Sequence, residues 1–396
     1  MNIKFSDRIS TLRPSAIREI LKVTQDPSVI SFAAGNPAPE SFPAREMQKI
    51  AVDLFENRSA VALQYGVSEG YGPLRELTAA RIKNKYGIGK SFDGLIITSG
   101  GQQVVEIAAK ILLNEGDAVL CETPSFIGAL NAFRSYNANL VGIPMDEHGM
   151  NMEVLEEKLK STPNVKLIYT IPTFQNPSGT TMSLSRRKEL LALAEKYNVI
   201  ILEDSPYFEL RYEGDDIPCI KSLDESGRVI YAGSYSKVLS PGIRIGFACA
   251  HSDIIAKMTV GKQVSDVHTN LFFQMITAEY LEKCDIDTHI KEIRKIYKSR
   301  AKVMADAMDE GFGARASFKR AEGGLFLWCS MPEGYDGMEY CRRIGAAKVA
   351  AVPGASFSVD ESEVSPSFRL NFSLMSEDVI KRGIGIMADV MADYVK

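Results

Sequence analysis

The sequence lacks the features that mark membrane, secreted and nucleic-acid-binding proteins. No segment is long and apolar enough to cross a bilayer, and residues 1–6 do not begin the apolar core of a signal peptide. The net charge is −4, without a basic excess or a run of like charges. We therefore expect neither nucleic acid nor a membrane as a partner.

Metal-ligand and disulfide patterns are also missing. The 4 histidines are scattered without metal-ligand spacing, and no two cysteines form a CxxC motif. The cysteines lie mostly within apolar runs typical of buried strands, at Cys121, Cys219, Cys249, Cys284, Cys329 and Cys341. We expect no metal site, and we expect buried free thiols in a reducing compartment, which predicts a cytoplasmic protein.

The composition and the order of patterns predict a large α/β protein. The chain has 396 residues, of which 45% are hydrophobic and 24% charged, enough for a large core and two domains. Buried-strand and helical patterns alternate over residues 95–250, which is typical of a mostly parallel, twisted sheet covered on both faces. A long helical pattern over 288–308 then indicates a bridge into a smaller C-terminal domain.

The stretch with the densest chemistry runs from residue 232 to 246. Ser234, Ser236 and Lys237 follow a strand-like apolar run, and Arg244 comes soon after them. A proline and a glycine force the backbone to turn between the lysine and the arginine. An amine in a cationic or apolar setting forms a Schiff base, and hydroxyls with a guanidinium hold a phosphate. The stretch therefore suits a ligand that has both a carbonyl and a phosphate.

Further polar residues follow neighbouring predicted strands. Asn176 begins a turn after one buried strand, and Asp204 ends the next strand. Together with Lys237 they lie at or just after the carboxyl ends of successive strands, where open α/β sheets bind ligands. A glycine turn at Gly101 and Gln102 opens a predicted helix, whose free N–H groups and dipole favour a phosphate. The sequence thus predicts one ligand site at this edge of the sheet.

These motifs resemble the fold-type I, pyridoxal-phosphate-dependent aminotransferases of class I/II, with aminoadipate/kynurenine-type enzymes as the nearest branch. The resemblance covers residues 14–369, nearly the whole chain. It implies a large domain with a mostly parallel, seven-stranded sheet and a smaller α+β domain. The implied division is a segment at 1–45 that joins the small domain and covers the active site, a large cofactor-binding domain at 46–284 and a small domain at 285–396.

The resemblance assigns the cofactor's ring to five residues. Lys237 would bind pyridoxal 5′-phosphate covalently and then act as general base and acid. Asp204 would keep the ring nitrogen protonated, so that the ring becomes an electron sink. Asn176 and Tyr207 would reach the phenolate oxygen, and Phe126 would stack on the ring.

The cofactor's phosphate is assigned to a second set, which comprises Gly101, Gln102, Ser234, Ser236 and Arg244. Many relatives carry a small hydroxyl where this chain has Gly101, so this position offers backbone donors alone. A tyrosine of the relatives reaches the other subunit's phosphate, and the matching residue here is Tyr65. This implies a homodimer with shared active sites, and simple interface contact is the alternative for Tyr65.

Substrate contacts are assigned to Gly35, Asn176 and Arg369. Arg369 matches the family's clamp for the α-carboxylate, since a planar fork fits a carboxylate in a way that lysine does not. Gly35 belongs to a Gly–x–Pro loop near that carboxylate. Arg18 stands where some relatives place a mobile arginine that recognises substrate, and a helix-surface charge explains it equally well.

The expected function is transfer of an amino group from an aromatic, branched-chain or 2-aminoadipate donor to a 2-oxo acid such as 2-oxoglutarate. Another fold-type I activity, that of a β-lyase or a decarboxylase, stays open. A third alternative is the ligand-binding module of MocR-like regulators. Those proteins also carry an N-terminal DNA-binding domain, whereas the aminotransferase pattern begins here by Arg13.

Overall fold

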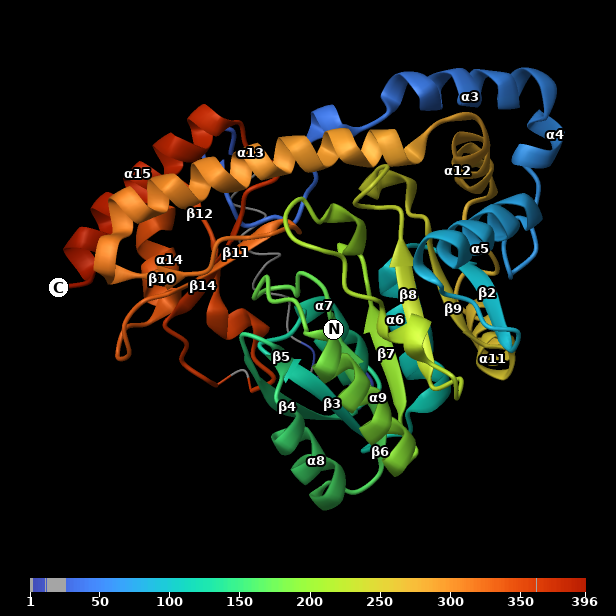
Figure 1. Ribbon diagram of the computed structural model, residues 1–396, viewed down its shortest axis with the longest axis horizontal. Coiled ribbons are helices and arrows are strands. Elements are labelled where there is room, and N and C mark those ends of the chain that lie inside the picture. The colour runs from blue at the N-terminus through green and yellow to red at the C-terminus, as the bar shows by residue number, and fades with distance from the viewer. Residues whose placement is uncertain (1–2, 11, 13–25, 361) are drawn as a thin grey trace.

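The computed structural model describes residues 3–10, 12, 26–360 and 362–396 (Figure 1). It contains a larger and a smaller β-sheet, and helix α13 (Ile286–Phe312) runs from the side of one to the side of the other. Arg18, a candidate substrate residue, lies outside the described residues.

Within the described residues, the larger sheet has eight strands in the order β2-β9-β8-β7-β6-β3-β4-β5. Their bounds are Asp93–Thr98 (β2), Ala118–Thr123 (β3), Asn139–Asp146 (β4), Gly149–Met150 (β5), Val165–Thr170 (β6), Ile200–Asp204 (β7), Val229–Ser234 (β8) and Gly246–His251 (β9). Strands β4, β3, β6, β7 and β8 run parallel, whereas β9 is antiparallel to β8 and β2. The predicted, mostly parallel sheet is confirmed, and the short hairpin partner β5 adds an eighth strand to the seven expected.

Helices surround this sheet. Their bounds are Asp7–Ser10 (α1), Ala44–Asn57 (α3), Ser59–Ala62 (α4), Gly72–Tyr86 (α5), Gly101–Leu112 (α6), Ile127–Arg134 (α7), Met152–Ser161 (α8), Leu184–Tyr197 (α9), Ile220–Leu223 (α10), Ser252–Gln263 (α11) and Leu271–Lys283 (α12). Short 3-10 turns add Pro39–Ser41 (η1), Phe208–Leu210 (η2), Pro241–Ile243 (η3), Gly313–Arg315 (η4) and Gly354–Phe357 (η5). Ser183 caps the start of α9, because its side chain accepts a hydrogen bond from the Arg186 N–H.

Apolar side chains on both faces hold the larger sheet between helices. Leu120, Ile168 and Ile201 belong to one buried cluster with side chains of α8 and α9. Val119 and Leu202 belong to another, with side chains of α6 and α11. Neighbouring residues of a strand point to opposite faces, so burial on both faces requires the near-continuous apolar runs seen in the sequence.

The smaller sheet is antiparallel, in the order β10-β11-β14-β13. Its strands and the nearby elements are Ser317–Phe318 (β10), Phe326–Ser330 (β11), Gly337–Ala346 (α14), Val352–Pro353 (β13), Ser367–Asn371 (β14) and Glu377–Tyr394 (α15). The early strand β1 (Ile30–Ser31) pairs in parallel with β12 (Val349–Ala350). Residues near the start of the chain therefore lie against the C-terminal part.

Helix α13 confirms the predicted helix over 288–308 and extends beyond it at both ends. It begins at Ile286 because the Asp285 carboxylate accepts hydrogen bonds from the N–H groups of Asp287 and Thr288. Along its second half it packs against α15.

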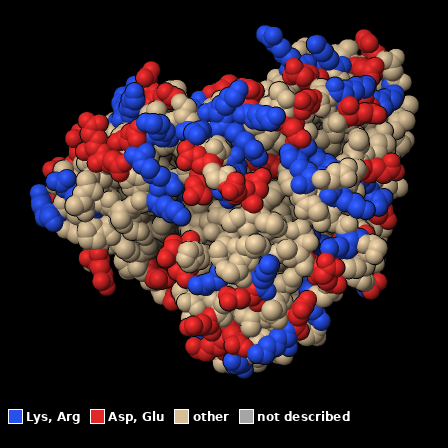
Figure 2. Space-filling view, viewed as in Figure 1, with Lys and Arg blue, Asp and Glu red and all other residues tan. Residues whose placement is uncertain are grey.

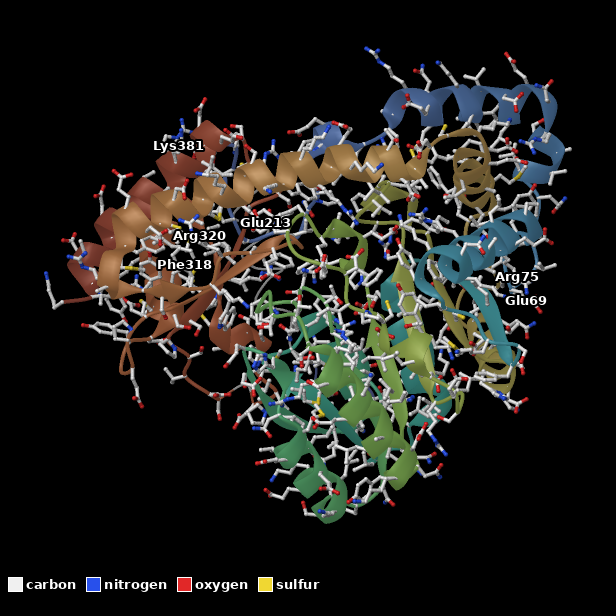
Figure 3. The ribbon with its side chains drawn as sticks, viewed as in Figure 1. Glu69, Arg75, Glu213, Phe318, Arg320 and Lys381 are labelled. Atoms are coloured by element: carbon white, nitrogen blue, oxygen red, sulfur yellow. The ribbon has the colours of Figure 1, made fainter. Side chains whose placement is uncertain are left out.

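The visible surface mixes both signs of charge, in keeping with a net charge of −4 (Figure 2). Figure 3 places Glu69 and Arg75 beside β2, where the Arg75 side chain donates to the Leu95 carbonyl oxygen at 3.2 Å. It places Arg320 and Lys381 around the smaller sheet, close to α13 and α15. None of the described helices is long and apolar enough to cross a membrane.

Candidate active site

A cleft of about 290 Å³ opens at the carboxyl ends of β6, β7 and β8. It brings together nearly all of the residues that the sequence predicts for the site, namely Gly35, Gly101, Gln102, Phe126, Asn176, Asp204, Tyr207, Ser234, Ser236, Lys237, Arg244 and Arg369. They come from segments more than 300 residues apart in the chain, since Gly35 and Arg369 border the same cleft as the strand ends.

Lys237 lies three residues after the end of β8. Its Nζ donates a hydrogen bond to the Gly35 carbonyl oxygen at 2.6 Å. Burial, helped by the positive charges of Arg369 and Arg244, lowers the pKa of Lys237 to about 8. A larger share of this amine is therefore neutral near pH 7 than of a lysine in water, as a nucleophile requires.

One end of the cleft is a cradle for an anion. Arg244 donates from Nη2 to the Ser99 carbonyl oxygen at 3.2 Å and from Nη1 toward Ser236 Oγ at 3.5 Å. Ser234 and the first turn of α6, with Gly101 and Gln102, border the same space. N–H groups in a first helical turn have no intrahelical acceptor, so they and the guanidinium point to a phosphate-like group.

Asp204, in another part of the cleft, favours a positively charged group of the ligand. This carboxylate is buried at the end of β7, and Tyr169 Oη donates to its Oδ2 at 2.8 Å. Burial raises the pKa of Asp204 to about 6, against the opposing effect of that hydrogen bond. A protonated nitrogen placed beside this carboxylate would compensate its burial.

Asn176 joins two other predicted residues. It follows β6 and precedes a cis proline, and its Nδ2 donates to Tyr207 Oη at 3.4 Å. Its Oδ1 accepts a hydrogen bond from Arg369 Nη1 at 2.7 Å. Asn176 therefore lies between the acidic strand end and the guanidinium of Arg369.

Arg369 projects from β14, the interior strand of the smaller sheet. Its Nη2 donates to the Ala33 carbonyl oxygen at 2.6 Å, and its guanidinium carbon lies 4.1 Å from the Phe326 ring centroid and 4.9 Å from that of Phe357. Burial lowers the pKa of Arg369 to about 10, and its Nε has no hydrogen-bond partner among the described residues. A buried cation with a free donor fits an incoming carboxylate.

Phe126 borders the cleft just before α7. Gly128 gives it room, because a Cβ at that position would lie 2.4 Å from the Phe126 ring. Gln102 Nε2 donates to the Gly128 carbonyl oxygen at 2.8 Å, which ties the start of α6 to this turn. The ring is thus held at the wall of the cleft.

Of the predicted residues that the structure describes, Tyr65 is not in this cleft. Tyr65 is 81% exposed and lies at a separate hollow, where its ring meets that of His268 at 5.8 Å. Arg18 lies outside the described residues. Within one chain, therefore, the structure does not bring Tyr65 to Lys237.

Sequence reasoning missed the residues that support the Asn176 turn. Gln175 is fully buried, and its side chain donates to the Pro124 carbonyl oxygen at 2.8 Å and to Glu122 at 3.2 Å, while accepting from Ser178 N–H at 2.8 Å. Burial raises the pKa of Glu122 to about 7. The available signal was an acid directly after a buried strand, which demands partners.

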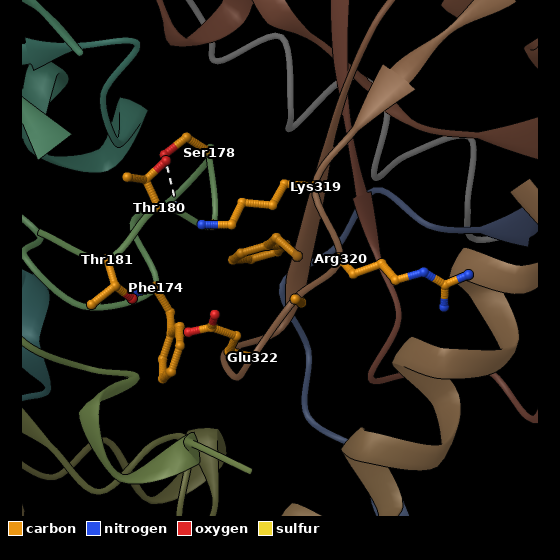
Figure 4. A pocket seen from close by; sticks show the side chains of 10 residues that line it. Phe174, Ser178, Thr180, Thr181, Lys319, Arg320 and Glu322 are labelled. Carbon is orange, nitrogen blue, oxygen red and sulfur yellow. Dashed lines mark hydrogen bonds between the residues drawn. The ribbon is translucent and has the colours of Figure 1, made fainter. Parts of the chain in front are cut away.

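Phe326, which borders the cleft, also borders a second, smaller hollow. Figure 4 shows this hollow from close by. It has a volume of about 50 Å³ and separates the turn with Ser178 and Thr180 from Lys319 and Glu322. This space is far smaller than the 290 Å³ cleft, so it does not compete as a cofactor site.

Comparisons with known proteins agree with this geometry. Residues 27–386 match the family model described as aminotransferase class I and II. The chain is 41% identical to aromatic-amino-acid aminotransferase 1 of Thermococcus litoralis, over 99% of this chain and 95% of that protein.

Solved structures of the same kind share the fold. Kynurenine aminotransferase of Pyrococcus horikoshii, in complex with PMP, superposes with a TM-score of 0.95 at 41% identity, over 99% of this chain and 98% of that one. LysN, an α-aminoadipate aminotransferase of Thermus thermophilus complexed with N-(5′-phosphopyridoxyl)-L-leucine, does so with a TM-score of 0.91 at 33% identity, over 98% and 97%. The chain therefore belongs to the class I and II aminotransferases, fold-type I enzymes that depend on pyridoxal 5′-phosphate.

Proposed function

We propose that this aminotransferase holds its cofactor on Lys237 and takes amino groups from aromatic and related α-amino acids, passing them to a 2-oxo acid such as 2-oxoglutarate. The observation that carries the proposal is the meeting of three groups in one cleft: the amine of Lys237 with its lowered pKa, the buried carboxylate of Asp204 and the free donor of Arg369. Lys237 would bind the cofactor's carbonyl carbon, Asp204 would pair with its ring nitrogen, and Arg369 would bind the α-carboxylate of the amino acid.

The donor set of the cleft fits this cofactor. Arg244, Ser234, Ser236 and the first turn of α6 at Gly101 and Gln102 offer the charge and the hydrogen bonds that a phosphate needs. An added Cβ at Gly101 would meet nothing closer than 3.9 Å, so this position supplies backbone donors without being crowded. When bound, pyridoxal 5′-phosphate supplies an electron-withdrawing ring that makes the Cα–H of a joined amino acid acidic.

The chain's own residues then move and hold protons. Lys237, once freed by the substrate amine, would act as general base and acid, taking the proton from the substrate Cα onto Nζ and giving it up again. Asp204 would keep the ring nitrogen of the bound cofactor protonated, because its buried carboxylate lacks any other cationic partner among the described residues. Asn176 and Tyr207 would hold the ring oxygen, and Phe126 would lie against the ring, since all three line the cleft.

Arg369 would orient the substrate by its α-carboxylate. Its guanidinium is already fixed by Asn176 and the Ala33 carbonyl oxygen, so little conformational freedom is lost when a carboxylate binds. Gly35 would border the same carboxylate; a Cβ there would lie 3.0 Å from the Phe326 ring, which leaves no room for a larger residue.

The cleft favours apolar donor side chains. Among the described residues that line it, the cations are Lys237, Arg244 and Arg369, and each has a role above. Ile171 and Phe326 offer apolar surface. An acidic substrate such as 2-aminoadipate or 2-oxoglutarate needs one more cation, and we assign that role to Arg18.

A homodimer completes the site in this proposal. Exposed apolar side chains are concentrated in one stretch of sequence, at Val52, Phe55, Val61, Leu63, Tyr65 and Val67. A second copy of the chain on this surface would bury them and carry Tyr65 to the partner's phosphate. The proposal also keeps the division into residues 1–45, 46–284 and 285–396 and a cytoplasmic location, which six free cysteines support.

Half-reactions with single donors test the function. The purified protein, loaded with pyridoxal 5′-phosphate, should lose its visible absorbance on addition of phenylalanine and regain it with 2-oxoglutarate. Release of ammonia and pyruvate, or of carbon dioxide, without an added 2-oxo acid would instead indicate a β-lyase or a decarboxylase. Arg18→Ala should impair the reaction of 2-aminoadipate and spare that of phenylalanine.

A further inference from the structure

A buried lysine outside the cleft calls for an explanation. Lys262 lies in the last turn of α11, and its side chain is 0% exposed. Its Nζ donates to Gln103 Oε1 at 2.7 Å, to both oxygens of Asp266 at 2.8 and 3.0 Å and to Thr269 Oγ1 at 2.9 Å. An ammonium group is costly to bury, so this position would be filled more easily by an apolar residue if α11 only had to pack.

The partners of Lys262 all reach one residue, Ser99. Gln103 Oε1 accepts a hydrogen bond from Ser99 N–H at 2.8 Å, and Asp266 Oδ2 accepts one from Ser99 Oγ at 2.7 Å. Thr269 Oγ1 lies 3.1 Å from the same hydroxyl. The backbone N–H and the hydroxyl of Ser99 therefore both hydrogen-bond to side chains that also accept hydrogen bonds from Lys262.

Ser99 in turn sets the anion cradle. It directly precedes the Gly100–Gly101 turn that opens α6, and its carbonyl oxygen accepts the hydrogen bond from Arg244 Nη2 at 3.2 Å. The turn is closely packed. A Cβ at Gly100 would lie 2.3 Å from Arg244 Nη2, and a Cβ at Gly246 would lie 2.6 Å from the Gly100 carbonyl carbon. A shift of Ser99 thus displaces the guanidinium and the helix N–H groups together.

We propose that Lys262 is a positioning residue for the cofactor's phosphate, acting through Gln103, Asp266 and Ser99 on the Gly100–Gly101 turn and Arg244. The inference rests on the proposed function, since it presumes that the cradle holds that phosphate. Lys262 itself does not border the cleft. It acts by fixing the positions of the Arg244 guanidinium and of the N–H groups at the start of α6, which preorganises these donors for a phosphate.

The charge balance of the network supports positioning rather than direct attraction. Lys262 faces Asp266, and hydrogen bonds from Lys262 and Ser99 outweigh burial and lower the pKa of Asp266. Burial lowers the pKa of Lys262, against its hydrogen bond to Asp266. With the shared proton on either partner, the pair adds little net charge near the cradle. The field that attracts a phosphate is left to Arg244 and the start of α6.

The test compares two ligands that differ only in the phosphate. Dissociation constants for pyridoxal 5′-phosphate and for pyridoxal are measured on the cofactor-free, full-length chain. Lys262→Met should lower the preference for the phosphorylated ligand about tenfold, which corresponds to about 1.4 kcal/mol, because Gln103, Asp266 and Thr269 lose a shared buried donor. Binding of pyridoxal, which lacks the phosphate, should stay unchanged. Lys257→Met, at an exposed position of the same helix, is the control and should leave both constants at their wild-type values.

A milder variant keeps the test decisive if Lys262→Met does not fold. Ser99→Ala removes only the hydroxyl that joins Asp266 and Thr269, and it should reduce the same preference. A preference equal to that of the wild type in a folded variant, or an equal loss for both ligands, would overturn the inference while leaving the proposed function intact. Failure of the wild-type chain to bind pyridoxal 5′-phosphate at Lys237 would overturn both.

Discussion

Replacing Arg369 by lysine keeps the positive charge and removes the planar fork. In the wild type, Asn176 Oδ1 and the Ala33 carbonyl oxygen occupy one hydrogen of each Nη at 2.7 and 2.6 Å, and Phe326 lies against the guanidinium. Nε and the remaining Nη hydrogens are left for a substrate carboxylate. A lysine at this position has three donors, and two of them would be needed for the same two oxygens.

The expected loss follows from that count. A hydrogen bond to a charged group contributes about 1.5–3 kcal/mol, and the variant loses the two-pronged contact while keeping the charge. We take the loss as about 3 kcal/mol, which corresponds to a fall in kcat/KM of about 100- to 200-fold at about 1.4 kcal/mol per factor of ten.

The assay follows the first half-reaction in single turnovers, with phenylalanine and with 2-phenylethylamine, which lacks the carboxylate. Arg369→Lys should slow the reaction of phenylalanine and leave that of the amine nearly unchanged, so that the discrimination between them collapses. The matched control is Arg320→Lys, since the Arg320 side chain is 53% exposed and pairs with Asp306 and Asp309 on α13 (Figures 3 and 4). Retention of the wild-type discrimination in Arg369→Lys would refute the carboxylate assignment.

Three further predictions concern Lys237, Asp204 and Gln175. The rate at which the cofactor-free chain captures pyridoxal 5′-phosphate should rise with pH and level off above about 8, because the neutral amine of Lys237 is the nucleophile and its pKa is lowered to about 8. Stopped-flow absorbance measures this. Asp204→Asn should stabilise the cofactor-free chain at pH 8 but not at pH 4, as urea unfolding would report. The folded-state pKa of Asp204 is raised to about 6, so its stabilising contribution is present below the unfolded value of 3.8 and is lost as the pH rises through 6. Gln175→Leu should lower kcat/KM for phenylalanine about tenfold or more, because it frees the turn that carries Asn176.

Each of these has an outcome that contradicts it. A capture rate that still rises above pH 10 would mean that the amine of Lys237 titrates like a lysine in water. A stability difference for Asp204→Asn that does not vary with pH would mean that the carboxylate is not destabilised by burial. Wild-type kinetics in Gln175→Leu would mean that the cis proline turn alone positions Asn176.

Local patterns were enough for the strand ends. Asn176 and Lys237 follow β6 and β8, and Asp204 ends β7, as predicted. Buried parallel strands are recognisable as apolar runs, and their carboxyl ends lie at one edge of the sheet. Arg369 was different. Nothing in its own strand pattern points to a cleft in which its partner Asn176 stands 193 positions earlier, and the assignment came from the family resemblance.

Contacts between distant side chains could not be predicted from the sequence. The Glu122–Gln175 and Lys262–Asp266–Ser99 networks join side chains from different helices, strands and loops. The hydrophobic periodicity of a helix or strand does not reveal which distant side chains will meet. Tyr65 illustrates another limit. Its place in a dimer depends on a second chain, so neither its pattern nor its 81% exposure in one chain assigns its partner.

The measurement that tests the central claim most directly is to locate the cofactor on the chain. The protein is incubated with pyridoxal 5′-phosphate, reduced with borohydride and digested, and the modified peptide is identified by mass spectrometry. We predict one phosphopyridoxyl group per chain, on Lys237, and none after prior conversion with phenylalanine. Modification of another lysine in its place, or of none, would contradict the account.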